Sequence, residues 1–81
     1  MYYVYILKNR DDRMYIGCTS DLKKRFREHI SKKVHSTRRM DNLKLVYYEA
    51  YIEKERAFNR EKKLKYFGSS YVGLMKRLQL K

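Results

Sequence analysis

Arg25 and His29 stand four residues apart in the segment TSDLKKRFREH. On a helix this spacing places one above the other, on the shoulder of an apolar stripe formed by Leu22, Phe26 and Ile30. An arginine can stabilise an anion through forked hydrogen bonds, and a histidine can exchange a proton near neutral pH. The structural alternative is an arginine that extends to solvent and a histidine with hydrogen-bond partners at the flank of the helix.

Glu61 is a second candidate, because it falls inside the apolar arc of the helix expected over 53–67. At about 100° per residue it lies between Leu64 and Phe58. A carboxylate there is costly to bury unless it is paired or bound to a metal. The alternative is a slightly rotated helix, with Glu61 at the rim and paired with Lys65 four residues on. The residues alone leave both interpretations open.

Tyrosines and a glycine share one face of the first two expected strands. Strand alternation places Tyr5 on one face of its strand, and Tyr15 and Gly17 together on one face of the next. A turn centred near Arg10 brings Tyr5 close to Tyr15. Gly17 removes a side chain from the face that Tyr15 occupies, which leaves room for the backbone of a ligand to approach. For each single tyrosine, packing in the sheet is the structural alternative.

Composition and spacing predict the elements that position these residues. Strand-forming residues dominate 2–8, 13–18 and 43–52, and the polar cluster 9–12 forms a turn between the first two strands. Thr19, Ser20 and Asp21 offer N-cap side chains for a helix over 21–31, the basic segment 32–42 is expected to be a loop, and Gly68 ends the helix over 53–67. That helix has an apolar side of Ala57, Leu64 and Phe67, and a last helix follows Ser69-Ser70. We expect one α+β domain over 1–81, with a three-stranded antiparallel sheet flanked by helices in the order β-β-α-β-α-α.

Charge indicates a polyanionic partner. The chain of 81 residues has 21 Lys and Arg against 9 Asp and Glu, a formal net charge of +12. Nucleic acid is the first candidate, because bound phosphates release counterions. An anionic membrane surface is the second, but no apolar run approaches a transmembrane span. Cys18 has no second cysteine to pair with, which agrees with a cytoplasmic protein. The cations that we expect to follow phosphates are Lys23, Lys24, Arg27, Lys32, Lys33, Arg38, Arg39, Arg60, Lys62 and Lys63.

Together these residues resemble the GIY-YIG nuclease domain. The resemblance covers essentially the whole chain and is closest to small stand-alone members, which are similar to the N-terminal nuclease domain of the bacterial repair excinuclease. It rests on Tyr3-Val4-Tyr5, on Tyr15-Ile16-Gly17 further along, and on Arg25, His29 and Glu61. Two departures stand out. Tyr3 occupies the place of the glycine in the family name, and 68–73 lacks the late asparagine of many members.

The resemblance implies a metal-dependent DNA endonuclease or nicking domain that acts in repair or recombination. Glu61 would bind one divalent ion, Mg²⁺ or Mn²⁺, which would be held weakly without DNA. Arg25 would hold the scissile phosphate. Tyr5, Tyr15 and His29 would form the proton-transferring side of the site, and we favour Tyr15 as the base or the group that positions water.

Two other functions would also account for the net positive charge of the chain. A module that binds DNA or recruits repair or recombination proteins would keep the fold and the basic face but cleave nothing. An RNA-directed protein of ribosomal type would not need Glu61, but the strands carry no aromatic residues at the spacing typical of RNA-recognition motifs. The oligomeric state is not predicted.

Overall fold

The computed structural model describes residues 1–66 and 68–78, so Phe67, expected on the apolar side of a helix, lies outside the described residues. The α+β class and the order β-β-α-β-α-α are confirmed. The elements are β1 (Tyr2–Lys8), β2 (Met14–Thr19), α1 (Leu22–Ile30), a short 3₁₀ helix η1 (His35–Thr37), β3 (Lys44–Tyr51), α2 (Lys54–Lys65) and α3 (Ser69–Leu78).

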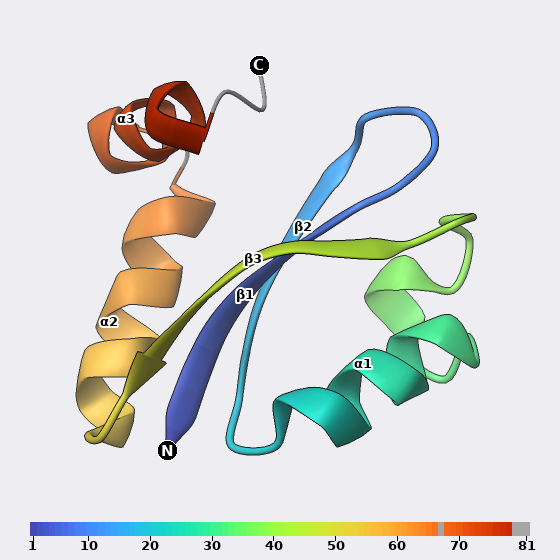
Figure 1. The fold of residues 1–81 in the computed structure, drawn as a ribbon, viewed down its shortest axis with the longest axis horizontal. Coiled ribbons are helices and arrows are strands. Elements are labelled where there is room, and N and C mark those ends of the chain that lie inside the picture. Colours follow the sequence, from blue (N-terminus) through green and yellow to red (C-terminus); the bar gives the residue numbers. More distant parts are fainter. Residues whose placement is uncertain (67, 79–81) are drawn as a thin grey trace.

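The three strands form an antiparallel sheet in the order β2-β1-β3, with β1 in the centre. Helix α1 lies on one side of this sheet, and α2 and α3 lie on the other (Figure 1). Alternation along β1 divides the core between the two sides. Val4 and Ile6 pack with residues of α2 and α3, whereas Tyr5 and Leu7 pack with residues of α1 and of the segment before β3.

The β1–β2 turn is longer than the sequence suggests. The Asn9 side chain accepts hydrogen bonds from the backbone N–H groups of Asp11 (3.0 Å) and Arg13 (2.8 Å), which orders a loop between the strands. Tyr5 therefore pairs with Gly17, and Leu7 with Tyr15. This pairing centres the turn on Asp11 instead of Arg10, a register offset of two residues, and the Tyr5 and Tyr15 rings still lie close together as predicted, with centroids 6.3 Å apart. Because the offset is an even number of residues, every side chain keeps its predicted face.

Helix α1 begins as predicted but buries a different residue. The Asp21 side chain accepts a hydrogen bond from the Lys24 backbone N–H at 3.1 Å and caps the helix. Leu22 and Phe26 pack toward the sheet, but Ile30 is 50% exposed, so its place in a buried stripe was wrong. The buried residue of the last turn is His29.

The segment 32–42 is not the plain loop that was expected. It contains η1, and it buries Val34 and Thr37. Neither residue belongs to a periodic apolar pattern, so hydrophobic spacing does not indicate this short helix.

Helix α2 closes the other side of the sheet. It buries Ala57 and Leu64, and Phe58 lies at its flank with 42% of its surface exposed. In the described part of the chain, no helix is long and apolar enough to cross a membrane.

Candidate active site at the edge of the sheet

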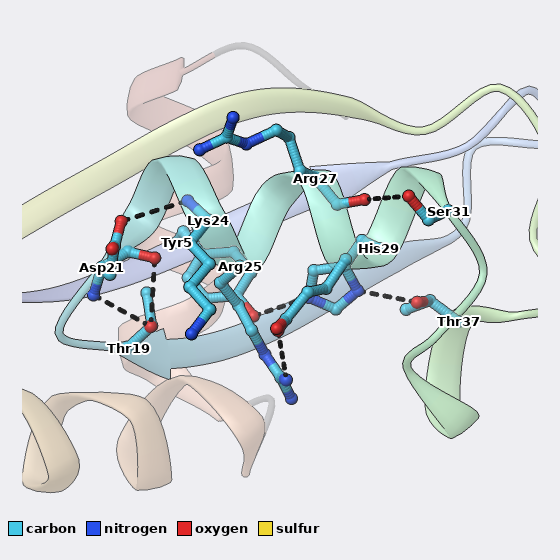
Figure 2. Close-up of polar contacts among 10 residues, drawn as sticks. Tyr5, Thr19, Asp21, Lys24, Arg25, Arg27, His29, Ser31 and Thr37 are labelled. Carbon is cyan, nitrogen blue, oxygen red and sulfur yellow. Dashed lines mark hydrogen bonds and ion pairs between the residues drawn. The ribbon is translucent and has the colours of Figure 1, made fainter.

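Three buried side chains form a hydrogen-bonded chain beneath α1 (Figure 2). The Tyr5 hydroxyl lies 2.7 Å from His29 Nε2, and His29 Nδ1 lies 2.7 Å from Thr37 Oγ1. Tyr5 and His29 are 1% exposed, and Thr37 is fully buried. A neutral imidazole donates from one nitrogen and accepts at the other, so the partner at one end fixes the role of the other end.

Burial keeps this chain uncharged at neutral pH. Two effects lower the pKa of His29 below its ordinary value of 6.5. The larger is desolvation by burial, and the smaller is the positive charge of Arg25. Burial, reinforced by Tyr15, raises the pKa of Tyr5 well above its ordinary value, although the Arg25 guanidinium opposes this shift. At Tyr5 the effect of burial on the pKa therefore outweighs that of the Arg25 charge. Tyr5 therefore keeps its proton and His29 is free to accept one.

Gly17 has a structural role that sequence reasoning missed. It lies opposite Tyr5 in the sheet and is itself buried. A Cβ at this position would collide with the hydroxyl end of the Tyr5 ring. Moving that ring aside would break the hydrogen bond between its hydroxyl and His29. The space beside Gly17, predicted for the backbone of a ligand, is therefore filled by Tyr5.

Tyr15 lies at the partly exposed end of the same cluster. Its ring centroid is 5.0 Å from that of His29 and 6.3 Å from that of Tyr5. Within residues 1–66 and 68–78, its hydroxyl makes no side-chain hydrogen bond. Of the three groups predicted to move protons, Tyr15 is the most exposed.

Glu61 reaches this edge from α2. Its carboxylate pairs with Lys65 at 3.1 Å, and its side chain is 19% exposed. The Lys65 ammonium also lies 5.8 Å from the Tyr15 ring centroid, which connects α2 to β2. The negative charge of Glu61 follows burial among the causes that raise the pKa of the nearby Cys18 thiol. The ion pair with Lys65, one of the two interpretations of Glu61, is present in the structure.

Arg25 projects from α1 beside the Tyr5 hydroxyl. Its Nη1 atom donates a hydrogen bond of 3.0 Å to Glu28 Oε1, and the arginine side chain is 38% exposed. Glu28, three residues on, was not singled out from the sequence, although the spacing allows the contact. The guanidinium thus lies between the buried chain and solvent, with one of its donors occupied.

Most of the predicted phosphate-binding cations are exposed, and one is not. Arg60 donates two hydrogen bonds to the Glu49 carboxylate, at 2.9 and 3.0 Å, and its side chain is only 22% exposed. This guanidinium is engaged within the fold, so its expected role at a DNA surface is corrected. The exposed cations of that prediction are Lys23, Lys24, Arg27, Lys32, Lys33, Arg38, Arg39, Lys62 and Lys63.

The comparisons with known proteins agree with one another. The family model of the GIY-YIG catalytic domain matches residues 1–76. A UPF0213 protein of Clostridium perfringens is 42% identical over 62 residues, which cover 75% of this chain and 67% of the relative. One from Streptococcus pneumoniae is 39% identical over 64 residues, covering 78% of this chain and 65% of the relative. The chain thus spans about two thirds of the length of these relatives.

A solved structure shows the same fold. The solution NMR structure of the UPF0213 protein of Bacillus halodurans matches with a TM-score of 0.60 and 32% sequence identity. The match covers 96% of this chain and 85% of the other chain.

Proposed function

This chain belongs to the GIY-YIG family, and we propose that it is a metal-dependent endonuclease or nicking domain that hydrolyses a phosphodiester bond of DNA. The observation that carries the proposal is the buried Tyr5–His29–Thr37 chain, which lies beside Arg25 and the ring of Tyr15. DNA, and proteins of repair or recombination, are the proposed partners.

The potential metal ligands at this edge of the sheet suit an ion that binds together with DNA. The described residues contain no cluster of three or more His, Cys, Asp or Glu side chains, so a metal here would take Glu61 as a single carboxylate ligand. Mg²⁺ commonly takes one or two carboxylates and completes its shell with water and substrate phosphate. When bound, the ion would polarise the phosphate and neutralise charge on the departing oxygen. Lys65 would have to release Glu61, and its exposed position permits this.

Arg25 is suited to hold the scissile phosphate. Its planar fork presents several N–H donors, and Glu28 engages one of them. A phosphate that enters here would bind the remaining donors in bidentate form, which lysine cannot do. The half-exposed position of Arg25 makes it accessible from solvent.

The buried chain is suited to take the proton of the attacking water. Tyr15 would position that water with its open hydroxyl. The water proton would pass to the Tyr5 oxygen as Tyr5 gives its own proton to His29 Nε2, and Thr37 would hold the Nδ1–H. The lowered pKa of His29 keeps its nitrogen unprotonated at neutral pH and ready to accept.

A DNA-binding or partner-recruiting module is the second candidate. The observation that favours it is the ion pair of Glu61 with Lys65, because a neutralised carboxylate does not need a metal. The segment 68–73 also lacks the late asparagine of many members.

The test is cleavage of nicked, branched and linear DNA, with and without Mg²⁺ or Mn²⁺, by the wild type and by Glu61→Ala and Arg25→Ala. We expect metal-dependent cleavage that both substitutions abolish while the protein stays folded. Salt-sensitive binding with no cleavage of any DNA would favour the binding module. Cleavage that survives Glu61→Ala would show that the metal site is elsewhere.

A further inference from the structure

A concave surface lies on the face of the sheet that α1 covers. It is a groove of about 460 Å³ between the start of α1 and the strands β1 and β3. Its lining is mainly aromatic and aliphatic, and consists of Tyr3, Ser20, Asp21, Leu22, Lys23, Phe26, Leu45 and Tyr48. The helix α2, which carries Glu61, lies on the other side of the sheet (Figure 1).

Two tyrosines of this groove, Tyr3 and Tyr48, are not part of the core. Neither belongs to the two clusters of packed hydrophobic residues, and Tyr48 is 53% exposed on the edge strand β3. Their rings meet edge to face, with centroids 6.0 Å apart. An edge-to-face pair leaves ring surface free for a further planar group. Tyr3 is also the residue that replaces the glycine of the family name.

The groove has cations beside it on α1. Lys23 lines it, and Arg27, one turn along α1, extends from the flank of the helix opposite to Arg25 (Figure 2). The Asp21 carboxylate also lies at the rim, but it is occupied as the cap of α1. Aromatic rings beside cations form the arrangement by which proteins bind single-stranded nucleic acid, since bases stack on the rings while phosphates contact the cations.

We propose that this groove binds an unpaired DNA base, with Tyr48 and Tyr3 as the stacking residues and Lys23 and Arg27 near the flanking phosphates. This inference rests on the proposed function, because it assigns the nuclease a substrate with a single-stranded segment beside the cleavage site. Groove and site share β1, where Tyr3 and Tyr5 are successive residues of one face. Paired bases in a duplex keep their faces stacked and offer the tyrosines no partner.

The test measures binding without metal, so it does not depend on cleavage. Fluorescence anisotropy follows a labelled oligo(dT) strand and a duplex of equal length as they bind the full chain. The variants are Tyr48→Leu, which removes the ring, and Tyr48→Phe, which keeps it. Tyr66→Leu is the matched control, because Tyr66 is 85% exposed at the end of α2 and outside the groove. Should Tyr48→Leu fail to fold, Tyr48→Thr replaces it with a residue that suits an exposed strand.

We expect Tyr48→Leu to weaken oligo(dT) binding by about tenfold and to leave duplex binding unchanged, with Tyr48→Phe and Tyr66→Leu close to wild type. An equal loss for strand and duplex, or no loss for either, overturns the proposal. A wild-type dimer that Tyr48→Leu converts to monomer, seen by sedimentation velocity, also overturns it, because a second copy then occupies the groove. If oligo(dT) binding depends on the Tyr48 ring but no DNA is cleaved, the role of the groove is supported and the nuclease proposal fails.

Discussion

Two glutamates of this protein, Glu49 and Glu61, both lie near tyrosines but differ in how fully they are bonded. Glu49 on β3 accepts hydrogen bonds from the hydroxyls of Tyr47 and Tyr51, each at 2.6 Å, and two from Arg60. Glu61 on α2 is close enough to Tyr5 to raise the pKa of that hydroxyl. Its carboxylate, however, forms its ion pair with Lys65, a half-exposed side chain.

Because of this difference, Glu49 is a structural carboxylate, whereas the Glu61 carboxylate is more available to a ligand. Burial tends to raise the pKa of Glu49, but the hydrogen bonds from Arg60, Tyr47 and Tyr51 outweigh it and lower that pKa. Burial and the bond to Glu49 raise the pKa of Tyr47 and of Tyr51 to about 12. A carboxylate with its lone pairs engaged has none to offer a cation. Under the proposed function, Glu61 would offer its oxygens to a metal once Lys65 moves.

The largest expected effect distinguishes Arg25 from Arg60. We expect Arg25→Lys to slow DNA cleavage by about a hundredfold, because an ammonium cannot make the forked contact to phosphate. The matched change Arg60→Lys keeps cleavage within about twofold and instead destabilises the fold. Single-turnover cleavage rates and thermal unfolding of both variants check this. Equal rates for Arg25→Lys and the wild type contradict the assigned role of Arg25.

Glu49 and Glu61 are expected to differ in how much they stabilise the fold. Glu49→Gln breaks the bidentate pair and leaves Arg60 without its counter-charge, which we expect to cost about 2 kcal/mol of unfolding free energy. Glu61→Gln loses one partly exposed ion pair, worth about 0.5 kcal/mol or less. Urea denaturation followed by circular dichroism measures both. A larger loss for Glu61→Gln reverses the comparison.

A smaller effect is expected at Thr37. Thr37→Val keeps the shape of the side chain but removes the hydrogen-bond partner of His29 Nδ1, so the imidazole loses one of the two contacts that orient it. We expect cleavage to slow by about tenfold and its pH profile to shift, while Thr37→Ser restores both. Identical pH profiles for Thr37→Val and the wild type show that the threonine only fills space.

The stabilising contributions of His29 and Glu49 are also lost in different pH ranges. The folded pKa of His29 lies below its ordinary 6.5, so its contribution is fully present above pH 6.5 and is lost as pH falls through the folded value. For Glu49 the contribution is present above its ordinary 4.5 and is lost at lower pH. We expect the unfolding free energy to fall in two stages, the first absent in His29→Gln and the second in Glu49→Gln. Urea denaturation at a series of pH values measures both stages, and one single stage in the wild type contradicts this.

The fold and the site differ in how far the sequence predicts them. Alternation and helical spacing identified the strands and α-helices and allowed the pair of Glu61 with Lys65, and the polar residues 19–21 indicated where α1 is capped, because these features depend on near neighbours. The exact register of β1 and β2 could not be assigned, because an asparagine in a turn is compatible with loops of more than one length and the Asn9 side chain also bonds the backbone of Arg13. Thr37 and Arg60 could not be assigned, since their partners are fixed by the path of a loop and by the packing of α2 on β3.

The central claim is that Glu61, and not Glu49, is the carboxylate open to a metal. NMR spectra of the protein, recorded with a duplex and with increasing Mn²⁺, test it directly, because the paramagnetic ion broadens amide signals near its site. We predict broadening centred on Glu61 and Tyr15 that requires DNA and disappears in Glu61→Gln, while the amides around Glu49 stay sharp. Broadening that is the same in Glu61→Gln, or that centres on Glu49, would contradict the account.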